Sequence, residues 1–115
     1  MVRKSDERKT VIRHEMRGGK GDVEMIESFS ADEIKSNVRV CSLIVINEGC
    51  SIGQHVHEGE DEIFYIIEGT GKVNDNGTDV IVTAGDSVLT GNGTSHGIEN
   101  IGNTPLKLFA VVITY

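Results

Sequence analysis

The sequence predicts an all-β protein, a sandwich or closed barrel built from short strands. Turn sequences recur every eight to twelve residues from Val38 onward, and no helical pattern of useful length lies between them. Glycine accounts for 14 of the 115 residues, well above the usual share of about 7%. The chain has only three Phe, two Tyr and no Trp, so its core must consist mainly of Val, Ile and Leu. A chain of this length is expected to form one domain.

Each strand of this fold can be placed from its own residues. Residues 38–46 form a continuous β-branched run, which predicts a strand buried on both faces or nearly so. Residues 63–67 predict a second strand, which ends at Gly69. Asn76-Gly77 indicates a hairpin formed by residues 72–74 and 78–82. The remaining predicted strands are residues 87–89, 97–100 and 106–115, and one helical turn is expected at residues 30–33.

The net charge of −7 is unevenly distributed. Residues 1–20 carry seven cationic and three acidic side chains, a net charge of +4, whereas residues 21–115 carry four against fifteen, a net charge of −11. An acidic body repels a phosphate backbone and the basic segment has no aromatic side chain for stacking, so we expect no nucleic-acid partner. We interpret residues 1–21 as a basic, flexible N-terminal arm and residues 22–115 as a single β-barrel domain.

The chain carries no pattern typical of membrane insertion or secretion. No apolar run approaches the roughly 18 residues that a membrane helix needs, and no apolar segment follows the basic N-terminal residues. Cys41 and Cys50 are too few and too irregularly placed for a disulfide framework. We therefore expect a cytoplasmic protein with two free thiols and no membrane partner.

Four residues in the β region have the chemistry of a metal site. His55 and His57 lie two residues apart, so on a strand both imidazoles point to the same face. Glu62 follows at the head of a predicted strand, and His96 comes directly after a polar, glycine-rich loop. Three neutral imidazoles and one carboxylate suit a divalent transition metal, and a set without thiolates argues against a closed structural zinc site. A His-x-His pair alone more often marks surface histidines.

The glycines around these residues carry a resemblance to a known family. The first group has the spacing G-x5-H-x-H-x4-E-x6-G of the first cupin motif: Gly49, His55, His57, Glu62 and Gly69. The second group matches the second cupin motif: Gly85, Gly93, His96 and Asn100. That motif has a proline where this chain has Gly91. The sequence resembles a small single-domain member of the cupin superfamily, with the matched motifs running from residue 49 to residue 100.

The resemblance implies a double-stranded β-helix, the jelly-roll barrel of cupins, here with a short N-terminal extension. It also implies that His55, His57, Glu62 and His96 hold one divalent transition metal per chain in the mouth of the barrel. Mn, Fe, Ni, Co, Cu and Zn all remain open. Because glycine replaces the motif proline at Gly91, we expect a loose loop before His96.

We expect a metal-dependent enzyme that acts on a small polar metabolite, a sugar or a carboxylate, at the open coordination positions of the metal. Relatives of this fold include isomerases, decarboxylases, lyases and dioxygenases, and the sequence does not select among them because fold does not determine function. The alternative is a binding or sensing module that holds a sugar or dicarboxylate at the same metal without turnover. The sequence assigns no catalytic residue.

Residues next to the motifs are further candidates. Strand alternation from Glu62 places Phe64 and Ile66 on the cavity side and Tyr65 on the outer side. Arg39 is either an anion ligand or an ordinary salt-bridge partner. Three acidic residues after His57 are interpreted as a solvated loop rather than general bases: Glu58, Glu60 and Asp61.

Three other polar residues have weaker claims on the site. Gln54 is a ligand contact or a surface residue. His14 lies outside both motifs and is interpreted as incidental, and Asn100 as a turn or packing residue.

A homodimer is expected for two reasons. A barrel of this size buries only part of its chain surface, and small domains often gain stability by association. The segment before Val38 has no core of its own, yet it contains apolar residues that need burial: Val23, Met25, Ile26, Phe29 and Ile34. Cupins of this size, by resemblance, commonly pair barrel to barrel, so we expect residues 23–29 to lie against the sheet of a partner chain.

Overall fold

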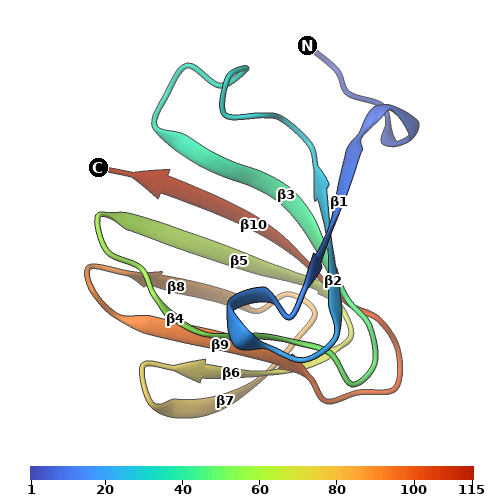
Figure 1. Cartoon of the computed structure of the whole chain (residues 1–115), viewed down its shortest axis with the longest axis vertical. Coiled ribbons are helices and arrows are strands. Elements are labelled where there is room, and N and C mark those ends of the chain that lie inside the picture. Colours follow the sequence, from blue (N-terminus) through green and yellow to red (C-terminus); the bar gives the residue numbers. More distant parts are fainter.

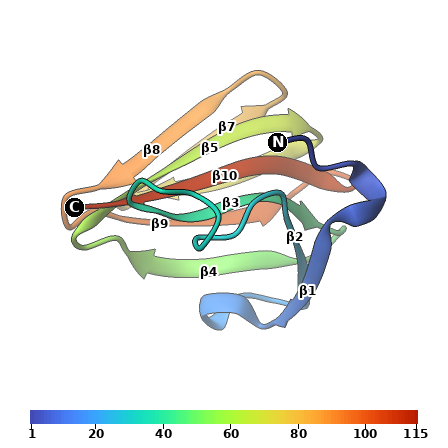
Figure 2. The same cartoon turned by 90° about the horizontal axis from the view of Figure 1, so that it is seen from above.

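Two antiparallel β-sheets, packed face to face, make up the structure, a computed structural model that describes residues 1–115 (Figure 1, Figure 2). In the order of pairing, the six-stranded sheet consists of β1 (Lys9–His14), β2 (Asp22–Glu27), β3 (Val38–Ile46), β10 (Leu106–Thr114), β5 (Glu60–Glu68) and β8 (Ser87–Gly91). The four-stranded sheet consists of β4 (Ser51–Val56), β9 (Ser95–Asn100), β6 (Thr70–Asp75) and β7 (Thr78–Thr83). Two short 3-10 turns, η1 (Ser5–Glu7) and η2 (Met16–Gly18), flank β1. The structure contains no helix of the length and apolarity needed to cross a membrane.

This arrangement confirms the all-β jelly-roll fold. β3 spans the residues predicted for it, and the predicted hairpin is formed by β6 and β7. Asn76 and Gly77 have φ values of 49° and 101°, the left-handed conformation that a two-residue hairpin turn requires. Ser30 and Glu33 exchange the hydrogen bonds of a capping box, but the chain makes only a turn there and no helix follows.

The core lies between the two sheets and consists mainly of β-branched residues and leucine. Alternation in β5 is strict: Glu62, Phe64 and Ile66 point inward and are buried, whereas Tyr65 is exposed on the outer side. The contiguous core comprises Val23, Ile44, Ile46, Ile52, Phe64, Ile66, Val73, Val82, Ile98, Leu106, Leu108 and Ala110. Burial of these side chains supplies most of the driving force for folding.

The structure corrects the expectation for residues 23–29. β2 pairs with β1 on one side and β3 on the other, all within one chain. Val23 is fully buried in the core of its own chain, so its apolarity does not require a partner. Residues 9–14 form β1, a strand without a buried side chain. The boundary after residue 21, between a flexible arm and the barrel, stays a prediction.

Candidate metal centre

Four side chains from both sheets converge at one end of the barrel. His55 lies on β4, His57 directly after it, His96 on β9 and Glu62 on β5. One nitrogen or oxygen atom of each lies within 4.8 Å of the others. The Nε2 atoms of His57 and His96 are 3.0 Å apart, and Glu62 Oε1 is 2.9 Å from both. His57, His96 and Glu62 are buried and His55 is half-buried.

Strand pairing explains why residues distant in sequence meet here. His55 and His96 are directly opposite one another in the β4–β9 ladder, after a register irregularity between Ile52 and His55. His57 lies beyond the end of β4, but its backbone continues the pairing: its N–H donates to Thr94 and its carbonyl accepts from Gly93. The backbone therefore fixes all three imidazoles.

Each imidazole is also oriented by a hydrogen bond at its other nitrogen. The Nδ1 of His55 is 2.7 Å from the carbonyl oxygen of Gly53, and the Nδ1 of His57 is 2.8 Å from Glu60 Oε1. The Nδ1 of His96 is 2.8 Å from Thr90 Oγ1. Donation from Nδ1 leaves the Nε2 lone pairs free, and outer hydrogen bonds of this kind are typical of metal-binding histidines.

The donor set and its spacing fit a metal ion. The Nε2 atoms of His57 and His96 and one carboxylate oxygen of Glu62 lie 2.9–3.0 Å from one another, a convergence of donor atoms that a divalent cation can bridge. Three imidazole nitrogens and a carboxylate are a donor set that suits a divalent transition metal.

Charged neighbours tune the groups around this centre. The Arg39 guanidinium, with a smaller effect of His57, holds the pKa of Glu60 below its usual range, against the opposing effect of burial. Burial lowers the pKa of His55; the other two imidazoles and Arg17 add to this lowering, and the Gly53 carbonyl opposes it. His55 therefore stays neutral, and able to bind a metal, below its ordinary pKa of 6.5.

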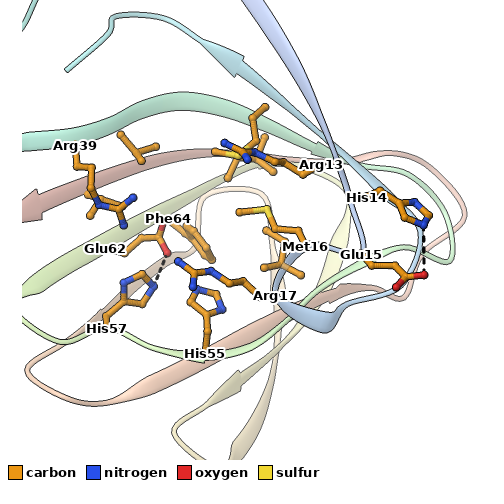
Figure 3. Close-up of a pocket in the computed structure, with 15 residues that line it drawn as sticks. Arg13, His14, Glu15, Met16, Arg17, Arg39, His55, His57, Glu62 and Phe64 are labelled. Carbon is orange, nitrogen blue, oxygen red and sulfur yellow. Dashed lines mark ion pairs between the residues drawn. The ribbon is translucent and has the colours of Figure 1, made fainter. Parts of the chain in front are cut away.

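A cavity of about 400 Å³ opens beside the four residues (Figure 3). His55, His57 and Glu62 form part of its wall, and Phe64, which stacks on His96 with the ring centroids 4.8 Å apart, forms another part. Arg13, Arg17 and Arg39 line it as well. The cavity therefore joins the ligand cluster to a cationic wall, and its dimensions suit a small anionic molecule.

Comparison with known proteins decides the family. A family model described as "Cupin domain" matches residues 42–112, more than half of the chain. The chain belongs to the cupin family. This confirms the resemblance on which the sequence interpretation rested, and the matched region contains all four residues of the cluster.

Both the sequence comparison and the structural comparison match this cupin to Thermotoga maritima. A protein named as oxalate-binding is 48% identical over 98 residues, which cover 85% of this chain and 81% of the relative. The crystal structure of a predicted oxalate decarboxylase from the same organism superposes over all of both chains with a TM-score of 0.95 and 44% identity. The polyketide cyclase RemF from Streptomyces resistomycificus has a TM-score of 0.79 at 18% identity, covering 99% of this chain and 80% of the other, and shares the fold.

The structure assigns local roles to most of the other candidates. Arg39 is a salt-bridge partner: it donates two hydrogen bonds, of 3.0 and 2.9 Å, to Glu60. The interpretation of Glu60 as solvated is wrong, because its side chain is 15% exposed and bonds His57. Glu58 is exposed, and Asp61 accepts a hydrogen bond from the Tyr115 hydroxyl.

The remaining polar candidates lie away from the cluster. Gln54 is exposed and donates to Ser95, and the exposed His14 pairs with Asp22. Asn100 is a packing residue: it is buried, donates to the carbonyls of Ile46 and Thr104, and accepts from the N–H of Gly102.

The loop at Gly91 is tied more closely than expected. A Cβ added at Gly91 would lie 1.9 Å from Asp61 Oδ1 and 2.9 Å from the Glu60 carbonyl oxygen, so a proline would not fit without a shift. The Thr94 hydroxyl accepts from the Gly91 N–H and donates to the Gly91 carbonyl. These bonds hold the turn before His96 without the motif proline.

Sequence reasoning missed the N-terminal wall of the cavity. Arg13, Met16 and Arg17 line it, although they lie far from both motifs. The glycines after Arg17 are the one local signal, and they fall within residues 1–21, the segment interpreted from the sequence as a flexible arm. Thr90, the hydrogen-bond partner of His96, could not be identified from the sequence because it is not a fixed position of either cupin motif.

Proposed function

We propose that this cupin binds one divalent transition metal through His55, His57, Glu62 and His96 and uses it to hold a small carboxylate. The convergence of three Nε2 atoms and one carboxylate, with each imidazole oriented by an Nδ1 hydrogen bond, carries the metal assignment. When bound, the metal supplies a Lewis acid at the cavity wall. Mn, Fe, Ni, Co, Cu and Zn all suit three imidazoles and a carboxylate.

The charge of the cavity supports an anionic ligand. Arg13, Arg17 and Arg39 line a cavity in a molecule whose net charge is −7. Positive charge is therefore concentrated at this wall although the molecule as a whole is negatively charged. The relative from Thermotoga maritima is named for oxalate, a dicarboxylate. A carboxylate oxygen is a suitable ligand for the same metals, and a guanidinium is a suitable partner for the remaining oxygens.

Binding without turnover is the function that the cavity supports best. Apart from the arginines and the candidate ligands, the ionisable groups that line the cavity are His14 and Glu15. These two form an ion pair, and Figure 3 places them at the far end of the cavity from His57 and Glu62. Decarboxylase, isomerase and lyase reactions need a proton donor or acceptor beside the ligand. The nearest other acid, Glu60, is engaged by Arg39 and His57.

A metal-dependent enzyme is the second candidate. The observation that favours it is the close structural similarity to a protein described as a predicted oxalate decarboxylase. In such an enzyme, His14, Glu15 or a water molecule would transfer a proton at the rim of the cavity.

One experiment tests the common proposal and separates the two candidates. The protein is purified, its metal content is measured, and oxalate binding to the metal-loaded and metal-stripped forms is titrated calorimetrically. The proposal expects about one metal per chain and oxalate binding that requires the metal. Incubation with oxalate and assay for formate and carbon dioxide then distinguishes an enzyme from a binding protein. Oxalate that binds equally well to the stripped protein contradicts the proposed site.

We also propose a homodimer formed by the outer face of the larger sheet. Tyr65 of β5 lies opposite Phe109 of β10, and Ile63 lies beside Val111 and Leu89 on neighbouring strands, all on the outer side. Leu89 is 68% exposed and Tyr65 50%, and contiguous apolar surface of this kind commonly marks an interface. Sedimentation should give twice the chain mass for the wild type.

A matched pair of variants tests this interface. Ile63→Glu places a charge in the proposed contact and should give the monomer mass, whereas Ile81→Glu, at an exposed position of the smaller sheet, should leave the dimer intact. If the wild type and both variants all sediment with the mass of a monomer, the proposal is contradicted. A cytoplasmic location also stays a proposal, compatible with Cys41 and Cys50 as free thiols, and cell fractionation tests it.

A further inference from the structure

The loop between β1 and β2 has backbone conformations that a simple connection between two strands does not require. Residues 15–18 contain η2, and Glu15, Met16 and Arg17 line the cavity (Figure 3). Glu15 and Arg17 have φ values of 49° and 55°, in the left-handed region that side chains other than glycine rarely adopt. Such conformations persist only where the surrounding structure holds them, and they cluster at ligand sites.

The surrounding structure holds this loop against β4, the strand that carries His55. A Cβ added at Gly19 would lie 2.2 Å from the Ser51 carbonyl oxygen, and one added at Gly53 would lie 2.1 Å from the Arg17 carbonyl oxygen. The two glycines therefore let the backbones approach closely. Ser51 donates its backbone N–H to the Lys20 carbonyl and accepts the Lys20 N–H on its hydroxyl. Met16 packs on the core from the same loop.

Docking the loop brings an unpaired cation to the candidate metal centre. Arg17 lines the same cavity as His55, His57 and Glu62, and Figure 3 shows its guanidinium directed toward them. The Arg17 side chain makes no hydrogen bond or ion pair with the protein. By contrast, Arg39 on another part of the wall is engaged by both oxygens of Glu60. In a body with fifteen acidic groups among residues 21–115, an unpaired arginine at a ligand cluster is available for a bound anion.

We infer that Arg17 is a ligand-binding residue that selects dicarboxylates, and that the strained loop serves to position it. The inference rests on the proposed function and deepens it: the metal holds one end of the ligand and the Arg17 guanidinium binds a carboxylate directed away from the metal. A planar guanidinium donates two parallel hydrogen bonds to a carboxylate, which a point charge does not reproduce. Residues 15–18 lie outside the segment that the cupin family model matches, 42–112, so this contact is a property of the chain and not of its family motif.

The first test compares two variants that each remove one positive charge from the same loop. Arg17→Gln removes the proposed contact, and Lys20→Gln removes an exposed cation that does not line the cavity. With Mn²⁺-loaded proteins, Arg17→Gln should weaken oxalate binding about tenfold to a hundredfold, the range for a hydrogen bond to a charged group. Acetate, which has no second carboxylate, should lose at most about threefold. Lys20→Gln should bind oxalate like the wild type.

The second test separates the residue from the fold. Glycine adopts the Arg17 backbone conformation without strain, so Arg17→Gly should keep or raise the melting temperature while weakening oxalate binding as Arg17→Gln does. Gly19→Ala should displace the loop and weaken oxalate binding, with Mn²⁺ content retained because no proposed ligand is touched. Each variant is analysed for bound metal as well as for oxalate affinity.

The outcomes for the inference and for the proposed function are distinct. A wild type that binds neither Mn²⁺ nor oxalate overturns the proposed function, and the inference with it. A wild type that binds both, with Arg17→Gln and Lys20→Gln of equal oxalate affinity, overturns the inference alone. A loss of acetate binding as large as the loss of oxalate binding overturns the selectivity for dicarboxylates.

Discussion

Replacing Glu60 by glutamine measures how strongly the outer hydrogen bonds hold the metal centre together. Glu60 Oε1 lies 2.8 Å from His57 Nδ1 and 2.9 Å from an Arg39 nitrogen, and Oε2 accepts from Arg39 at 3.0 Å. Glutamine keeps the shape of the side chain but turns one oxygen into a donor. The amide oxygen can take over both bonds at Oε1, so His57 keeps a neutral acceptor in place of a charged one. The new NH₂ group then faces Arg39 Nε, donor against donor.

The size of the effect follows from these contacts. A hydrogen bond to a charged group contributes about 1.5–3 kcal/mol, and loss of an outer partner of a metal-binding histidine typically costs about tenfold to a hundredfold in metal affinity. The two figures agree, since a factor of ten corresponds to about 1.4 kcal/mol. The Glu60 side chain is 15% exposed, so solvent screening reduces the effect little. We expect Glu60→Gln to bind Mn²⁺ about tenfold to a hundredfold more weakly than the wild type.

Competition with a chelator of known affinity measures the change. Glu58→Gln is the matched control, because it removes the same charge two residues away from an exposed side chain. Circular dichroism and thermal unfolding of the metal-free proteins show whether the barrel is intact. If Glu60→Gln and Glu58→Gln bind Mn²⁺ equally well and both are folded, the charge of Glu60 does not stabilise the site through His57, and the expected loss of metal affinity is wrong.

Four further outcomes are expected. His57→Ala should lose most bound metal and keep its circular dichroism spectrum, because the apolar strands do not depend on the metal; stoichiometric metal of unchanged affinity would refute the assignment. Metal should be released as the pH falls below about 6. Because burial lowers the folded-state pKa of His55 from its ordinary value of 6.5, the unfolded chain binds more protons at this residue below that pH. The metal-free protein should therefore lose thermal stability as the pH falls from 7 to 5. Asn100→Ala should lower the free energy of unfolding by about 2–4 kcal/mol in denaturant titrations, since one buried and two partly buried hydrogen bonds to the backbone are lost.

The sequence predicted the strands whose residues carry their own pattern. β3 is a mainly apolar run, interrupted by Arg39 and Ser42 and buried along its second half. The β6–β7 hairpin depends on a turn for which Asn76-Gly77 is nearly obligatory. The four residues of the candidate site could also be named in advance, because their spacing follows from strand alternation and from the cupin motifs. For the strands the information lies within a few residues of the feature, and for the site it lies in motifs that run from residue 49 to residue 100.

The elements that were missed depend on contacts distant in the sequence. β1 has no buried side chain, so no alternation marks it, and it exists because β2 provides a partner edge. β2 contains apolar residues, but the sequence does not determine where they are buried. Burial against a partner chain and burial in the chain's own core are equally compatible with the sequence. Glu60 was interpreted as solvated because its two partners, Arg39 and His57, are brought to it only by the fold.

The positions of the charged residues suggest how one barrel serves different ligands. The four candidate ligands lie within residues 42–112, the part that matches the cupin family model. The three arginines of the cavity, Arg13, Arg17 and Arg39, all precede that part. Under the proposed function, the family barrel supplies the metal ligands, and the segment before it supplies the charge that selects an anion. If this division holds, exchanging residues 1–41 between cupins that share the ladder of β3 and β10 should change ligand preference and leave metal affinity largely unaltered.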